Sequence, residues 1–91
     1  MFFSKLFKKK VTEKRYRVTI FTREQVLKSE SFDDFKEAEN WLLKHEGAFR
    51  FIYEFFVIDI HDMNIKNGAN LIAQFVKDGK VEQYRRLAAL N

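Results

Sequence analysis

Residues 49–60 constrain the fold of this 91-residue chain most, because they are apolar on both faces of an extended strand. The segment reads Phe-Arg-Phe-Ile-Tyr-Glu-Phe-Phe-Val-Ile-Asp-Ile and is rich in aromatic and β-branched side chains. A central strand that is covered on both sides has this composition. A buried helix that continues past Gly47 is the alternative, but the residue types favour the strand.

A β-hairpin is predicted ahead of this segment. Residues 15–22 alternate strictly, with Tyr16, Val18 and Ile20 on one face and mainly charged or polar side chains on the other. Such a period of two, with β-branched residues, is typical of a half-buried strand. Residues 25–31 predict a second strand, and the short segment between the two suits a hairpin turn.

Residues 32–46 carry the clearest helix pattern. Ser31 is expected to cap the helix with Asp34 as its capping-box partner, and Gly47 to supply the left-handed position after the last turn. Five residues recur at helical spacing and predict the buried stripe: Phe35, Ala38, Trp41, Leu42 and His45.

The C-terminal part predicts a second hairpin. Asp78-Gly79 lies between two apolar-containing runs and is expected to form a two-residue turn that pairs Val76 with Val81. Two short helices within residues 71–87 are the alternative, since the apolar residues there also fit helical spacing.

These elements predict an α+β fold: a small antiparallel sheet of about four to five strands, in the order ββαβ followed by a hairpin, with one amphipathic helix packed on one face. We expect a single domain over residues 11–91, preceded by a basic amphipathic arm at residues 1–10. The expected core comprises Val18, Ile20, Phe35, Trp41, Leu42, Phe56 and Ile58.

The absent residue types exclude several classes of site. Without Cys the chain has no disulfides, thiolate zinc sites, iron–sulfur clusters or cysteine nucleophiles. Asp59 and His61 would share a strand face and could orient a general base, but the sequence offers them no third partner. We therefore expect no enzyme activity, no catalytic residue, no cofactor and no metal. With no apolar run of 18 residues, we expect a cytoplasmic protein.

Charge is unevenly distributed along the chain. Residues 1–28 hold nine basic and two acidic side chains, a net charge of +7, whereas residues 29–64 carry a net charge of −6 and residues 65–91 carry +3. Such asymmetry predicts that one end of the molecule attracts anions. The alternative is that basic and acidic segments face each other in the fold and leave little external field.

The leading functional hypothesis is a small non-enzymatic module that binds nucleic acid through the basic arm and the first hairpin. Its candidate binding residues are Lys8, Lys9, Lys10, Lys14, Arg15, Arg17 and Arg23. Residues 16–43, a basic hairpin followed by Ser-Phe-x-x-Phe-x-Glu-Ala-Glu-x-Trp-Leu, locally resemble the arm-type DNA-binding domains of phage tyrosine integrases. That resemblance implies DNA binding by the hairpin. In that family, however, a third strand precedes the helix, and its usual turn glycine is absent here.

Two other binding modes stay open. The chain has 11 Phe, more than one helix and a small sheet need, so exposed Phe and Arg could bind another protein or a second copy in a homodimer. The basic arm could also make weak contact with a membrane surface through its apolar side chains, which are Phe2, Phe3, Leu6 and Phe7.

Overall fold

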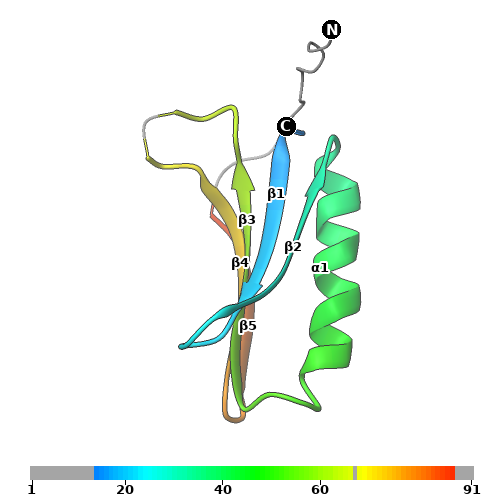
Figure 1. Ribbon diagram of the computed structural model, residues 1–91, viewed down its shortest axis with the longest axis vertical. Helices are drawn as coiled ribbons and strands as arrows, with labels where there is room; N and C mark the ends of the chain where they lie inside the picture. The colour runs from blue at the N-terminus through cyan, green and yellow to red at the C-terminus, as the bar shows by residue number, and fades with distance from the viewer. Residues whose placement is uncertain (1–13, 67, 88–91) are drawn as a thin grey trace, which may run out of the picture.

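The computed structural model describes residues 14–66 and 68–87 and contains five strands and one helix (Figure 1). In chain order these are β1 (Tyr16–Phe21), β2 (Val26–Phe32), α1 (Phe35–Phe49), β3 (Phe55–Asp62), β4 (Leu71–Asp78) and β5 (Val81–Arg86). The molecule is an antiparallel sheet with one helix packed on it, so the predicted α+β class and the order of its elements are confirmed.

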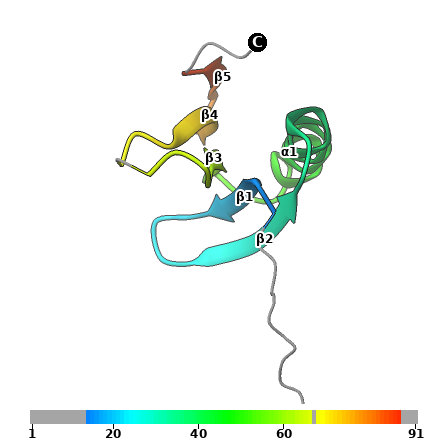
Figure 2. The same ribbon diagram turned by 90° about the horizontal axis from the view of Figure 1, so that it is seen from above.

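The strands lie in the order β2-β1-β3-β4-β5, and every neighbouring pair is antiparallel. Residues 55–60 of the predicted strand 49–60 form most of β3, which occupies the middle of the sheet as predicted. The first part of the prediction is wrong, because Phe49 ends α1 and residues 50–54 form the turn that leads into β3. Helix α1 connects edge strand β2 to central strand β3 and lies against β1, β2 and β3 (Figures 1 and 2). This connection leaves β5 at the opposite edge of the sheet.

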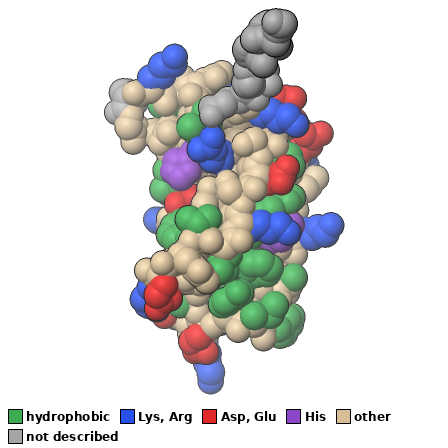
Figure 3. Space-filling view, in the orientation of Figure 1, with side chains coloured by type: hydrophobic (Ala, Val, Ile, Leu, Met, Phe, Trp, Pro, Cys, Tyr) green, Lys and Arg blue, Asp and Glu red, His purple; other side chains and the backbone are tan. Residues whose placement is uncertain are grey.

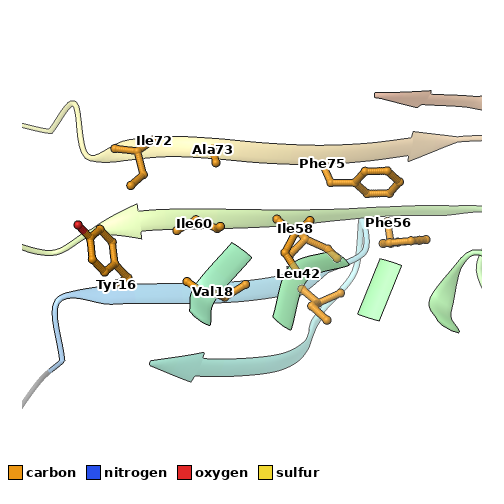
Figure 4. Packing of buried hydrophobic residues seen from close by; sticks show 11 residues of the cluster. Tyr16, Val18, Leu42, Phe56, Ile58, Ile60, Ile72, Ala73 and Phe75 are labelled. Carbon is orange, nitrogen blue, oxygen red and sulfur yellow. The ribbon is translucent and has the colours of Figure 1, made fainter. Parts of the chain in front are cut away.

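The core lies between α1 and one face of the sheet. Alternate residues of β1, β3 and β4 point toward the helix (Figure 4), and Val18, Ile20, Leu42, Phe56 and Ile58 are fully buried, as predicted. The other two expected core residues, Phe35 and Trp41, are only partly buried and pack against the rim of this cluster. Both lie on the helix: the Phe35 ring meets Tyr16 at the start of β1, and the Trp41 ring meets Phe32 at the end of edge strand β2.

The helix lies three residues later than predicted. Ser31 belongs to β2, Asp34 is the N-cap without a side-chain hydrogen bond, and Gly47 lies inside the helix rather than after it. The cause is packing beyond Gly47: Phe49 contacts Tyr53 and Phe56, with ring centroids 5.7 and 6.1 Å apart. Burial of this ring against the sheet outweighs the local preference of glycine to end a helix.

The last hairpin forms as predicted, but its turn is Gly79-Lys80 instead of Asp78-Gly79. Gly79 adopts a φ of +63°, which glycine accepts without steric cost. The shifted register places Tyr84 opposite Phe75 and Val76 opposite Gln83, not opposite Val81. Tyr84 then lies on the helix side of the sheet, where it packs against the core.

Candidate interaction surfaces

The structure divides the predicted cationic site. Lys8, Lys9 and Lys10 lie outside the described residues. Lys14, Arg15 and Arg17 gather at the start of β1, whereas Arg23 lies in the turn after β1. Six residues of extended chain place Arg23 roughly 20 Å from Arg15. The described members of the site therefore occupy both ends of the sheet instead of one continuous ribbon.

Arg15 is held by a buried carboxylate. Its Nε and Nη2 atoms donate to Oδ1 and Oδ2 of Asp62 at 3.0 and 2.9 Å, which is the bidentate geometry of a strong ion pair. The hydrogen bonds from Arg15, together with one from the Asn64 backbone N–H, hold the pKa of Asp62 below its usual range, although burial opposes them. Half of the Arg15 side chain stays exposed, but its charge is balanced within the fold.

The other three described cations differ in their surroundings. Arg23 stacks on the Phe55 ring, 3.8 Å from its centroid, and approaches Asp78 with 3.9 Å between Nη2 and Oδ2. Arg17 lies opposite His61 on the sheet face away from α1 and is half-buried. Lys14 is exposed.

A second ionic cluster ties α1 to the far edge of the sheet. The buried carboxylate of Glu39 accepts a hydrogen bond from Tyr84 Oη at 2.6 Å and a bidentate contact from Arg86 at 2.9–3.0 Å. Burial alone would raise the pKa of Glu39, but these hydrogen bonds outweigh it and hold the pKa below its ordinary value. Burial and the Glu39 charge raise the pKa of Tyr84 to about 12.

Arg50 forms a parallel link at the other end of the helix, where it binds both Glu46 and Glu82. Sequence reasoning missed the Arg15–Asp62 pair and the contact between Glu39 and Arg86 because the members of each are far apart in the chain. Each pair is separated by 47 positions. Part of the basic charge thus faces acidic groups within the fold.

Asp59 and His61 share the sheet face away from α1, as the alternation in β3 predicts. Asp59 Oδ1 accepts a hydrogen bond from Gln74 Nε2 at 2.8 Å. Burial raises the pKa of Asp59, and the Gln74 hydrogen bond and the nearby His61 only partly oppose this shift. Within the described residues, no group of three His, Asp or Glu side chains gathers where it could hold a metal ion.

An exposed apolar surface lies at the end of the molecule where α1 stops. The neighbouring residues Phe51 and Ile52 are 85% and 67% exposed, and we call these two residues the apolar end. Figure 3 shows hydrophobic side chains gathered on this lower part of the molecule. Single exposed apolar residues are ordinary, but a group of large ones marks a contact surface.

The backbone that carries the apolar end is fixed on several sides. The N–H groups of Ile52 and Tyr53 both donate to the Phe49 carbonyl, at 2.9 and 3.0 Å. The next residue, Glu54, accepts from the Gly79 N–H at 3.0 Å, which ties this segment to the β4–β5 turn. Phe51 and Ile52 are therefore presented to solvent on a hydrogen-bonded turn.

A hollow of about 260 Å³ lies beside this turn. The β1–β2 turn and the start of β3 line it, with Arg23 and Glu24 on one side and Tyr53 and Phe55 on the other. Its volume is below the roughly 300–1,000 Å³ of most small-molecule sites.

No family model matches the chain, and comparison with the curated proteins and with the solved structures found no significant match. In the part of the chain that the structure describes, no helix has the length and apolar character to cross a membrane.

Proposed function

We propose that this domain is a non-enzymatic binding module that docks another protein on its apolar end. The observation that carries the proposal is the exposure of Phe51 and Ile52, two adjacent large apolar side chains on a turn fixed by hydrogen bonds. Burial of a large apolar side chain contributes about 1.5–3 kcal/mol of favourable free energy. A partner that covers Phe51 and Ile52 would gain this contribution from each of them.

The surroundings of the apolar end favour a protein as the ligand. Aromatic residues and arginine are enriched in protein interfaces, and this surface offers both in Phe51, Tyr53 and the stacked pair of Arg23 and Phe55. Because the turn is already ordered, binding costs little conformational entropy. The adjacent hollow supplies a recess for one anchoring side chain of the partner.

The test compares capture by the full chain with capture by a Phe51→Ser/Ile52→Ser variant. Each immobilised protein is incubated with nuclease-treated lysate of the source organism, and the retained proteins are quantified by mass spectrometry. We expect at least one protein that the wild type retains and the double variant loses. That protein, once purified, should bind the wild type at least about tenfold more tightly than it binds the double variant. A loss of about 1.4 kcal/mol in binding free energy changes the affinity by this factor.

Leu43 offers a matched control, because it is an exposed apolar residue on the helix away from the turn. A Leu43→Ser variant should capture the same protein as the wild type. The proposal fails if the double serine variant retains every wild-type partner, or if the purified candidate binds both proteins equally.

Nucleic-acid binding is the second proposal. It is supported by the cluster of Lys14, Arg15 and Arg17 at the start of β1, directly after a segment rich in lysine. Labelled DNA and RNA are titrated at several salt concentrations, and the affinity should fall steeply as salt rises. Asp62→Asn, which removes the charge that balances Arg15, should raise the affinity. Absent or salt-insensitive binding would exclude this function.

A further inference from the structure

Strand β5 is an edge strand with an exposed outer side. It pairs only with β4 among the described strands, and Figure 2 shows it at the edge of the sheet remote from β2. Natural edge strands are commonly protected by charged side chains, proline, bulges or covering elements, because unpaired backbone groups invite another strand. β5 contains no proline, its pairing with β4 has no bulge, and its charged residues Glu82, Arg85 and Arg86 include both signs.

We propose that β5 pairs with β5 of a second copy of this chain, antiparallel and with Tyr84 on the two-fold axis. The resulting dimer has one continuous sheet of ten strands. This surface is distinct from the apolar end, and the proposal goes beyond the docking function.

The backbone groups needed for this pairing point in the right direction. The Leu87 N–H donates to the Ile72 carbonyl at 2.8 Å, so Leu87 turns its backbone groups toward β4. Backbone groups alternate along an antiparallel strand. Those of Glu82, Tyr84 and Arg86 therefore point outward, away from β4, and are the ones that a second strand would meet.

The side chains select one register. A two-fold axis at Tyr84 places Glu82 of each copy opposite Arg86 of the other, and opposite charges in directly facing positions attract. The same register places Val81 opposite Leu87 of the other copy. Both are large apolar residues, 66% and 42% exposed in the single chain, and the pairing brings them into contact.

The carboxylate of Glu82 can accept a second guanidinium. It already binds Arg50 through Oε1 at 3.0 Å, and the Arg86 side chain, although bound to Glu39, stays half-exposed. The dimer would join the Arg50–Glu82 pair of one copy to the Glu39–Arg86 pair of the other in one ionic network across the interface. The neighbouring register, with Gln83 on the axis, instead places Lys80 opposite Arg86, where like charges repel.

Gln83 provides the test, because it is exposed and the proposed register places it opposite Arg85 of the other copy. Sedimentation velocity of the full chain over a wide concentration range gives the dimer dissociation constant. We expect Gln83→Glu to lower this constant and Gln83→Lys to raise it. Each change should be about three- to tenfold, since the pair occurs twice in the symmetric dimer.

Substitutions on the opposite edge control for net charge. Ser29 is an exposed residue of β2, so Ser29→Glu and Ser29→Lys change the protein charge without touching β5. The proposal requires that the dimer dissociation constants of the two Gln83 variants differ clearly more than those of the two Ser29 variants. It is overturned if the full chain is monomeric at every concentration, if both Gln83 variants weaken the dimer equally, or if the Ser29 variants have the same effect.

Discussion

One link between helix α1 and strand β5 centres on a buried carboxylate, that of Glu39. It is 5% exposed and accepts hydrogen bonds from both Tyr84 and Arg86. Glu39→Gln preserves the shape but removes the charge, so the hydrogen bonds from Tyr84 and from Arg86 all weaken. A hydrogen bond to a charged group contributes about 1.5–3 kcal/mol, and a neutral one about 0.5–1.5 kcal/mol. We expect a loss of about 2 kcal/mol in the free energy of unfolding.

The loss should depend on pH with a definite sign. The pKa of Glu39 is lower in the folded protein, so its stabilisation is complete above the pKa of the unfolded chain, about 4.3. It is lost as the pH falls through the lower folded value. The difference in stability between wild type and variant should therefore be largest near neutral pH and shrink below pH 4.

Urea unfolding at a series of pH values measures this difference, and thermal unfolding at neutral pH should show a melting temperature lower by about 8–16 °C. Glu37→Gln, an exposed glutamate on the same helix, is the control and should cost at most about 1 kcal/mol. A Glu39→Gln penalty below that of the control, or one that persists unchanged into acid, would refute the reasoning.

Two glycines should respond to alanine in opposite directions. Gly47→Ala should stabilise the protein by about 1 kcal/mol in chemical denaturation, because the residue lies within α1 and a Cβ there meets no atom within 4 Å. Gly79→Ala should destabilise it by about 1–2 kcal/mol in the same assay, since its φ of +63° strains any residue with a Cβ; equal effects at both positions would contradict this. Phe56→Ala should cost about 3–5 kcal/mol because the buried ring packs between Phe49 and Phe75, and a calorimetric melting temperature near that of the wild type would contradict its place in the core.

The strands could be predicted because their signals are local. Alternation in residues 16–21 and the apolar run that forms β3 both reflect which faces are buried, and both appear directly in the sequence. The end of α1 could not be predicted in the same way. Gly47 predicts a helix end, but the contact of Phe49 with Phe56 decides it, and that contact exists only in the folded chain.

The surfaces were harder to predict than the fold. Phe51 and Ile52 have the composition of a buried strand, so nothing local distinguishes them from the residues of β3. The excess of Phe was the one signal that some apolar side chains would stay exposed. The placement of Arg15 depends on Asp62, which is distant in sequence, so a count of charges in residues 1–28 could not show that this cation is balanced.

Photo-crosslinking in living cells tests the binding role of the apolar end most directly. A photoreactive amino acid replaces Phe51 in one full-length variant and Lys14, which is exposed at the start of β1, in another. A nuclease-resistant protein adduct at position 51, with a much weaker one at position 14, is the expected result. No adduct at position 51 and a nuclease-sensitive adduct at position 14 would contradict the account.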